Sequence, residues 1–231
     1  EGKLYGLIGP NGAGKTTVFN LLTGIYQPSE GSIRFAGDDL VGLKSFAITK
    51  KGVARTFQNI RLFGNLTVLD NIKVAFNYHI GYHLIDSIFR SRAFRAQERQ
   101  ILEESMDLLQ LFGLEGKYDQ LAKNLPYGEQ RRLEIARALA TRPKLLLLDE
   151  PGAGMNPHEI EQLIELIRWI RQEFNLTILL IEHHMQVVMR LCERITVMDF
   201  GETIAEGTPA EVQSNPRVIE AYLGEEEAEV V

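Results

Sequence analysis

The chain has 231 residues, a net charge of −6, 45% hydrophobic residues and one cysteine, Cys192. This length suits one large domain, or a domain with a sizeable lobe. The negative charge argues against a dedicated nucleic-acid binder, because such proteins usually carry a basic face. A single cysteine excludes an internal disulfide, and we interpret it as a small buried side chain. No apolar run approaches the ~18 residues that span a bilayer, so we expect any membrane role to act through partners.

The chain opens with a predicted strand, a glycine-rich loop and a predicted helix. Leu4–Ile8 is typical of a short buried strand, and Thr17–Leu22 of the first turns of a helix. In this setting the loop predicts a phosphate-binding site, because glycines let backbone N–H groups surround phosphate oxygens and the helix N-terminus favours negative charge. Lys15 is expected to reach the β- and γ-phosphates, and the Thr16 hydroxyl to bind Mg²⁺. The loop consists of Gly9, Pro10, Asn11, Gly12, Ala13, Gly14, Lys15 and Thr16.

Short apolar runs then alternate with helical patterns, which favours an α/β fold with a largely parallel sheet. A strand pair near Ser32–Phe35 and Glu202–Glu206 is expected to be antiparallel, because each segment follows a glycine-containing turn. The expected parallel strands are Leu4–Ile8, Val53–Thr56, Leu145–Asp149, Thr177–Ile181 and Arg194–Met198.

Helical periodicity dominates the middle of the chain. Asn156-Pro157 is a start signal for a helix with apolar residues at helical spacing from Ile160 to Ile170, and a similar period runs from Ile101 to Phe112. The segment from Leu69 to Leu139 contains no convincing strand. We therefore predict a single domain, 1–231, in which 1–68 and 140–231 form the α/β core and 69–139 a helical subdomain.

An acidic pair follows the apolar run Leu145–Leu148. Ligands of open α/β sheets bind at the carboxyl ends of the strands, where Asp149 and Glu150 lie. Asp149 is suited to the Mg²⁺ shell, and Glu150 to orienting and deprotonating the water that attacks the γ-phosphate. The alternative is a structural role, in which the two carboxylates cap a helix start.

Two polar side chains follow other predicted strands. Gln58 comes shortly after Val53–Thr56, where its amide could bind Mg²⁺ or the attacking water. His183 comes after the strand ending at Ile181, where it could hydrogen-bond the γ-phosphate. From these residues alone, a surface glutamine and an ordinary strand-end histidine remain open alternatives.

A turn at Asn124 leads into an amphipathic helix that ends near Leu139, shortly before the acidic strand. With this segment the whole chain resembles the nucleotide-binding subunit of an ATP-binding cassette (ABC) transporter, and every motif of that family follows in order. The resemblance implies that Gly9–Thr17, which includes Thr17, is the Walker A loop and that Gln58 is the Q-loop glutamine. It implies that Leu125–Gln130 is the signature segment and that Leu145–Glu150 is the Walker B strand with its catalytic glutamate. It also implies that Gly152–Asn156 is the D-loop and that His183 is the switch histidine.

The resemblance implies an ATPase that uses ATP and Mg²⁺. Two ATPase subunits, identical or different, would meet head to tail, with each ATP between Walker A of one and the signature of the other. Two transmembrane permease subunits would dock near Gln58 and Phe63, and an extracytoplasmic substrate-binding protein would act with them. The chain would then lie peripherally on the cytoplasmic face of the inner membrane and bind no nucleic acid.

Several details resemble the larger ATPase subunit of branched-chain amino-acid importers. Urea and amide importers and the lipopolysaccharide-export ATPase share some of them, so these remain alternatives. Two further alternatives are an ABC ATPase acting on nucleic acid or ribosomes, and an inactive regulatory module. The details lie in Arg55–Phe63, Leu66–Ile72, Tyr127-Gly128, Ile181–His183 and Asn215–Gly224.

The chain departs from the family pattern at the signature, where Leu-Ser-Gly-Gly-Gln is usual. Pro126 has neither hydroxyl nor N–H, and Glu129 would repel phosphates if it faced them, so we expect weaker clamping of ATP. His184 and Asn156 stand where aspartates are usual. A family strand pair carrying the adenine-stacking aromatic residue is expected upstream of Glu1 and is missing from this sequence. The signature residues here are Pro126, Tyr127, Gly128, Glu129 and Gln130.

Overall fold

The computed structural model describes residues 1–76 and 90–228. Its internal contacts divide the chain into two units. Residues 1–58 and 144–231 form the first, which we call the core unit, and residues 59–143 form the second, which we call the helical unit. The helical subdomain predicted over 69–139 lies inside the helical unit.

The core unit is built on one six-stranded sheet with the order β4-β5-β6-β1-β7-β8. The five strands from β4 to β7 pair in parallel, and β8 pairs antiparallel with β7. Leu, Ile and Val dominate the central strands because helices cover both faces of a parallel sheet. The predicted α/β fold and its parallel strands are confirmed. The strands are β1 (Leu4–Ile8), β4 (Val53–Arg55), β5 (Leu145–Asp149), β6 (Thr177–Ile181), β7 (Arg194–Asp199) and β8 (Glu202–Gly207).

The two segments predicted as antiparallel do not pair with each other. β2 (Arg34–Phe35) pairs with β3 (Asp38–Asp39), while β8 pairs with β7. The reason is local, because each pair is closed by a two-residue turn in which both residues have positive φ, as two-residue hairpins require. The turn residues are Ala36 and Gly37 in the first hairpin, and Phe200 and Gly201 in the second.

The register of the sheet brings several strand ends to one edge. Asp149 on β5 lies opposite Ile181 on β6, which in turn lies opposite Leu7 on β1. The segments that leave these three strands therefore start side by side. This edge carries the phosphate loop, the acidic pair and the predicted switch histidine.

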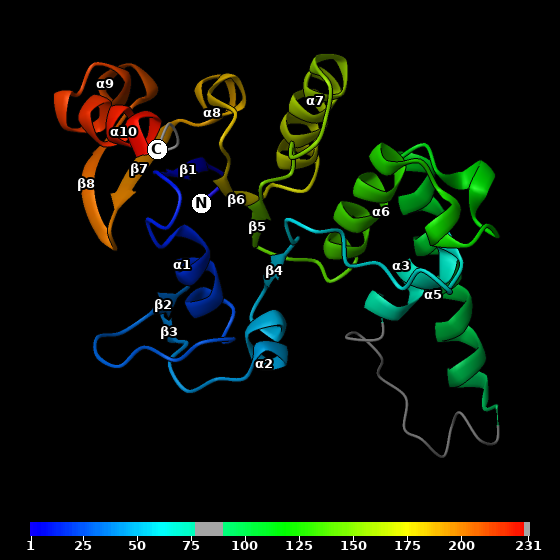
Figure 1. Ribbon diagram of the computed structural model, residues 1–231. Helices are drawn as coiled ribbons and strands as arrows, with labels where there is room; N and C mark the ends of the chain where they lie inside the picture. The colour runs from blue at the N-terminus through cyan, green and yellow to red at the C-terminus, as the bar shows by residue number, and fades with distance from the viewer. Residues whose placement is uncertain (77–89, 229–231) are drawn as a thin grey trace. The chain divides into compact units, whose positions relative to one another are not determined.

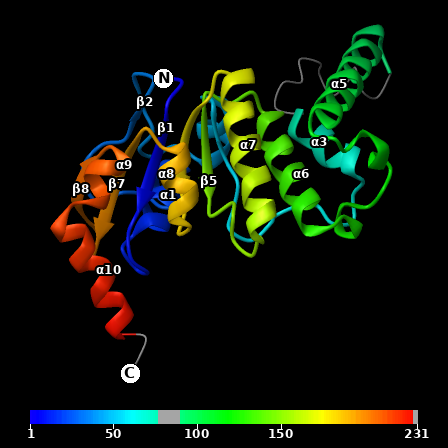
Figure 2. The ribbon, with the colours of Figure 1, turned by 90° about the horizontal axis from the view of Figure 1, so that it is seen from above.

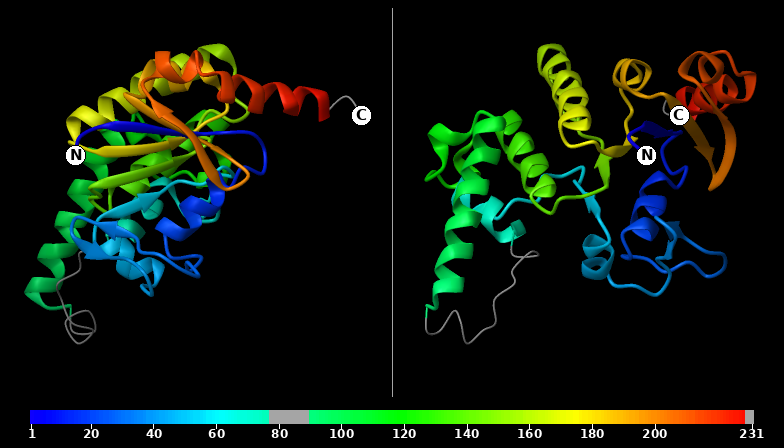
Figure 3. Two further views of the ribbon diagram at one scale, coloured as in Figure 1. Left: turned by 90° about the vertical axis from the view of Figure 1, so that its left-hand side faces the viewer. Right: turned by 180° about the vertical axis from the view of Figure 1, so that it is seen from behind.

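Helices cover both faces of the sheet, with α1 and α2 on one side and α7 and α8 on the other (Figures 1 and 3). The last two helices, α9 and α10, lie beside β8 (Figure 2). Their bounds are α1 (Lys15–Leu22), α2 (Ser45–Lys50), α7 (Pro157–Glu173), α8 (Met185–Leu191), α9 (Pro209–Gln213) and α10 (Pro216–Ala228).

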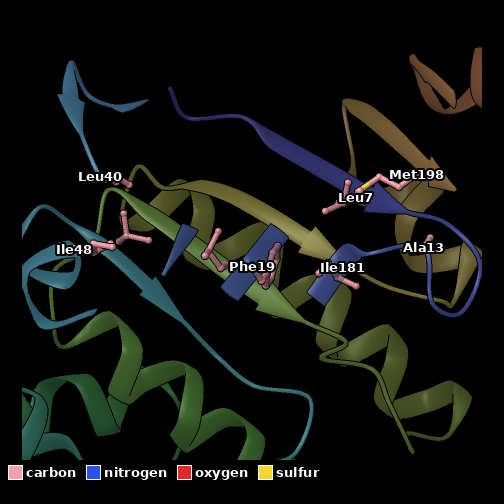
Figure 4. Packing of buried hydrophobic residues seen from close by; sticks show 9 residues of the cluster. Leu7, Ala13, Phe19, Leu40, Ile48, Ile181 and Met198 are labelled. Carbon is pink, nitrogen blue, oxygen red and sulfur yellow. The ribbon is translucent and has the colours of Figure 1, made fainter. Parts of the chain in front are cut away.

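A buried apolar cluster fixes α1 against the sheet. Phe19 on α1 is fully buried at the centre of this cluster, with Leu7 from β1 and Ile181 from β6 among its members (Figure 4). Burying a side chain such as Phe19 contributes about 1.5–3 kcal/mol. The phosphate loop joins β1 to α1, so this packing fixes both ends of the loop.

Cys192, at the end of α8, is buried and free. Burial raises the pKa of its thiol to about 12, so it stays protonated at neutral pH. A Cβ added to Gly6 would lie 2.9 Å from its sulfur, which indicates how closely α8 packs on β1. The interpretation of Cys192 as a small buried side chain is confirmed.

The α7 helix begins where the sequence predicts. The side chain of Asn156 accepts hydrogen bonds from the N–H groups of His158 and Glu159, and the Glu159 carboxylate accepts one from the Asn156 N–H. This capping box stabilises the helix by roughly 1 kcal/mol. The apolar residues at helical spacing are buried, and they are Ile160, Leu163, Ile164, Ile167 and Ile170.

The helical unit contains α3, which packs against both α5 and α6 (Figure 1). Between 69 and 139, the part that the structure describes holds no strand. None of the helices in the described ranges is both long and apolar enough to cross a membrane. The elements are α3 (Val68–Phe76), α5 (Arg92–Leu111), η2 (Glu115–Lys117), η3 (Ala122–Asn124) and α6 (Tyr127–Leu139).

Candidate nucleotide site

The phosphate loop adopts a backbone that only glycine tolerates at two points. Gly9 has a φ of 152°, and a Cβ there would lie 2.1 Å from the carbonyl oxygen of Met198. Gly14 has a φ of 98° and is the N-cap of α1. The loop is also tied to the β7–β8 turn, because the N–H of Gly201 donates to the Ala13 carbonyl at 3.0 Å. These contacts fix the course of the loop backbone.

Lys15 occupies the interior of this loop. It is only 6% exposed, and its ammonium donates to the carbonyl oxygens of Gly9 at 2.6 Å and Pro10 at 2.7 Å. A buried ammonium needs such acceptors, because leaving it without them costs several kcal/mol. Phosphate oxygens are stronger acceptors than carbonyls, so Lys15 is set where a triphosphate can take over these bonds.

Arg55 on β4 is an unexpected member of the site. It donates to the Asp149 carboxylate at 2.7 Å and to the Asn20 side-chain oxygen on α1 at 2.7 Å. Its guanidinium also lies over the rings of Phe19 and Phe57, 5.4 Å and 4.8 Å from their centroids. Arg55 thus joins the end of the acidic strand to the helix that follows the phosphate loop.

Removing the Arg55 charge should destabilise the fold strongly. Both side chains of the Arg55–Asp149 pair are 5% exposed, so Arg55→Met leaves a buried carboxylate unpaired, at a cost of about 3–5 kcal/mol. Urea unfolding followed by circular dichroism measures this loss. The matched control is Arg194→Met, which removes a pair whose side chains are 47% and 56% exposed and should cost less than about 1 kcal/mol. An equal loss of unfolding free energy in the two variants would contradict the larger contribution expected of the buried Arg55–Asp149 pair.

Glu150 lies at the centre of a three-residue cluster. His183 Nε2 lies 2.9 Å from one of its carboxylate oxygens, and the Gln58 amide nitrogen donates to the other at 2.7 Å. Glu150 has a φ of 46°, a left-handed conformation that is uncommon outside glycine and that occurs preferentially at functional sites. The structure therefore brings together the three residues predicted as catalytic. A carboxylate between an amide and an imidazole is equipped to accept a proton and to fix a water molecule.

The predicted metal ligands have the chemistry that Mg²⁺ requires. A hydroxyl from Thr16, a carboxylate from Asp149 and an amide from Gln58 are hard oxygen donors, and Mg²⁺ in such sites completes its shell with phosphates and water. Within residues 1–76 and 90–228, no group of three or more His, Cys, Asp or Glu residues is placed to hold a metal. Thr16, Asp149 and Gln58 thus offer oxygen donors of the kind that Mg²⁺ binds, and Asp149 shares its carboxylate with Arg55.

The signature residues begin α6 in the helical unit. Pro126 is the N-cap of α6 and offers no side-chain cap. Glu129 in the first turn binds Lys117 through both carboxylate oxygens, at 2.7 Å and 2.6 Å. This ion pair neutralises the charge that was expected to repel phosphates, so Pro126 remains the main departure from the family pattern.

The other signature side chains mostly support the helix start. The Tyr127 hydroxyl accepts a hydrogen bond from Arg131 at 3.3 Å, and Gln130 donates to the Leu125 carbonyl at 2.8 Å. The Glu129 N–H in the first turn of α6 donates to the Pro126 carbonyl at 3.0 Å, whereas the Gly128 N–H stands where a helix offers no carbonyl of a preceding turn. The Gly128 N–H is therefore the signature group best suited to meet an anion.

Three residues of the site were missed by sequence reasoning, namely Arg55, Lys117 and Glu182. Arg55 and Glu182 each lie at the end of an otherwise apolar strand, and a charge in that position is a usable signal. Lys117 gives no such signal, because a lysine in a short polar segment such as Glu115–Lys117 is ordinary.

The strand–phosphate loop–helix unit, set at the edge of a parallel sheet beside an acidic strand end, defines a P-loop nucleoside triphosphatase. Residues 1–153 match the ABC transporter family model, and residues 202–228 match the model of the branched-chain amino acid ATP-binding cassette transporter. The chain therefore belongs to the ABC transporter ATP-binding family.

Relatives and solved structures agree with this assignment. The chain is 48% identical over 225 residues to the high-affinity branched-chain amino acid transport ATP-binding protein BraF of Pseudomonas aeruginosa, covering 97% of this chain and 88% of that protein. It is 47% identical over 223 residues to LivG of Escherichia coli, described in the same words, with coverage of 96% and 88%. A crystal structure of an ATP-binding cassette of an ABC transporter in its ADP conformation matches with a TM-score of 0.81 at 31% identity, covering 97% and 89%.

Proposed function

We propose that this chain is the ATP-hydrolysing subunit of an ABC importer for branched-chain amino acids. The ATPase chemistry is supported most directly by the cluster in which His183 and Gln58 both contact Glu150. The substrate class is supported by relatives that carry this name and match nearly the whole chain. The C-terminal match over residues 202–228 favours the same subgroup.

In this proposal the core unit performs the chemistry. The phosphate loop and Lys15 bind the triphosphate, with Thr17 as a further nucleotide contact. Thr16, Asp149 and Gln58 offer oxygen ligands to Mg²⁺, which when bound neutralises phosphate charge. Glu150 accepts a proton from the water that attacks the γ-phosphorus, and the bond to the ADP oxygen breaks.

The helical unit supplies the complementary half of a second site. We propose that the α6 N-terminus, with Gly128 at its first turn, meets the γ-phosphate bound to another ATPase subunit. ATP is then part of the subunit interface, and its binding favours the closed dimer. Two transmembrane subunits and an extracytoplasmic binding protein complete the importer, which holds this chain at the cytoplasmic face of the membrane.

Restoring serine at Pro126 should tighten this interface. The φ and ψ of Pro126 are −55° and 153°, which a serine N-cap also adopts. One added hydrogen bond to a charged phosphate should strengthen ATP-driven dimerisation by about tenfold. Light scattering of the Glu150→Gln chain in MgATP, alone and with the second ATPase subunit, measures the effect.

Lys44→Ser serves as the control, because Lys44 is the N-cap of α2 and has no side-chain cap. It adds a cap away from the signature and should leave dimerisation unchanged. Unchanged association in Pro126→Ser would refute the proposed weak clamp.

The transported substrate is tested by uptake into vesicles that contain the chain and its permease and binding-protein partners. We expect ATP-dependent uptake of radiolabelled leucine, which excess valine or isoleucine suppresses and excess urea does not. Uptake of urea or a short amide in place of leucine would favour the alternative importer. ATP hydrolysis without uptake of any of these would contradict the importer proposal.

A further inference from the structure

Glu182, which directly precedes His183, has a buried carboxylate with an unusual set of partners. The residue is 2% exposed. One carboxylate oxygen accepts a hydrogen bond from the Gly152 N–H at 2.7 Å. The other accepts bonds from the N–H groups of His183 at 2.8 Å and His184 at 3.1 Å, and lies 3.1 Å from His184 Nδ1. The Glu182 side chain thus bonds the backbone of two loops, its own loop at His183 and His184 and the D-loop at Gly152.

The two loops held by Glu182 flank the proposed reaction centre. Gly152 lies two residues after Glu150, and its carbonyl oxygen accepts a bond from the Met155 N–H, so it sets the course of the D-loop. His183 contacts the Glu150 carboxylate through its ring. The Glu150 N–H also donates to the Ile181 carbonyl at 2.9 Å. The Glu182 carboxylate therefore bonds the backbone of His183 itself and the backbone two residues after Glu150.

The chain is built closely around this carboxylate. A Cβ added to Gly152 would lie 2.6 Å from the nearer Glu182 oxygen and 2.8 Å from Ile160 Cδ1. Glycine at this position is what permits the carboxylate to reach the backbone N–H. The backbone groups that bond the Glu182 carboxylate are all N–H donors, so a glutamine would turn its own NH₂ group toward an N–H. The site therefore selects a carboxylate.

We propose that Glu182 is a positioning residue for ATP hydrolysis, which couples the D-loop to the switch histidine. Through this carboxylate, a shift of the D-loop at Gly152 moves the backbone of His183, and a shift of the His183 backbone moves the D-loop. The D-loop segment then sets the distance between His183 and Glu150. This inference rests on the proposed ATPase role of Glu150 and His183.

The coupling is tested first by amide hydrogen exchange on this chain. The methyl group of Gly152→Ala pushes the Glu182 carboxylate away from its place, so the N–H groups of His183 and His184, which this carboxylate accepts, should exchange faster. The control is Gly116→Ala in the helical unit, where a Cβ meets nothing within 4 Å, and exchange at His183 should not change. Faster exchange confined to the D-loop would overturn the proposed coupling.

The effect on catalysis is tested with Glu182→Gln in the chain assembled with its partners. A displacement of order 1 Å at a reacting group costs about 100-fold, so kcat should fall by about that factor while KM for ATP changes by less than about threefold. Glu206→Gln makes the same chemical change at an exposed pair and should leave both constants unaltered.

Two results distinguish this inference from the proposed function. If the wild-type assembly hydrolyses ATP and Glu182→Gln keeps its kcat, the positioning role is wrong and the ATPase proposal stands. If the wild-type assembly hydrolyses no ATP, the proposed function fails. The exchange experiment needs no turnover and still decides whether Glu182 couples the two loops.

Discussion

Replacing Glu150 with glutamine is expected to lower ATP turnover by about 10²–10⁴-fold and to leave the affinity for ATP nearly unchanged. Glutamine keeps the size of the side chain but cannot accept the proton from water. Its amide also disturbs the cluster, because both carboxylate oxygens of Glu150 contact nitrogen atoms, those of His183 and Gln58. ATP itself is bound mainly by the phosphate loop, which this change does not touch.

Phosphate release from MgATP and binding of a fluorescent ATP analogue measure the two quantities separately. Glu193→Gln is the matched control, because Glu193 pairs with Arg171 at the exposed end of the sheet. Its turnover should equal that of the wild type. Unchanged turnover in Glu150→Gln would show that another group takes the proton from water.

Replacing Lys15 with alanine should weaken ATP binding by at least about 100-fold, which corresponds to about 2.7 kcal/mol. The buried ammonium of Lys15 is already held inside the phosphate loop by the carbonyls of Gly9 and Pro10. Without it, the triphosphate loses a charge-assisted partner, and the two carbonyls face negative phosphate oxygens instead. Turnover should fall together with affinity.

Isothermal titration with MgATP measures the affinity of this variant. Lys3→Ala removes an exposed lysine from the start of the core unit and should bind ATP like the wild type. Wild-type affinity in Lys15→Ala would contradict the assignment of this loop as the phosphate site.

Much of the core unit could be predicted from sequence, because its strands are short apolar runs with clear ends. The predicted ranges for β1, β5 and β6 match the observed bounds. The pairing of the segments near 32–35 and 202–206 was wrong because hairpin turns with positive φ give each segment a nearer partner. The choice of pairing partner for a strand depends on the geometry of its turn, and the spacing of glycines in the sequence does not reveal that geometry.

Site residues that belong to a sequence motif could be predicted. Site residues that are placed by tertiary contacts were harder to predict. The structure brings Gln58, Glu150 and His183 together as the family resemblance implied. The partners of the remaining charges could not be predicted, because the pairs form only when separate elements pack together. Arg55 on β4 reaches Asp149 on the neighbouring strand β5, and Lys117 at the end of η2 reaches Glu129 on α6. Their roles, like those of the other site residues, stay predictions until tested.

The most direct test of the account is phosphate release from MgATP by the purified chain, alone and assembled with its transmembrane partners. We expect the wild-type chain to release phosphate, assembly with the partners to increase the rate, and Glu150→Gln to lower release by about 10²–10⁴-fold while still binding ATP. A wild-type assembly that binds ATP but releases no phosphate would contradict the account.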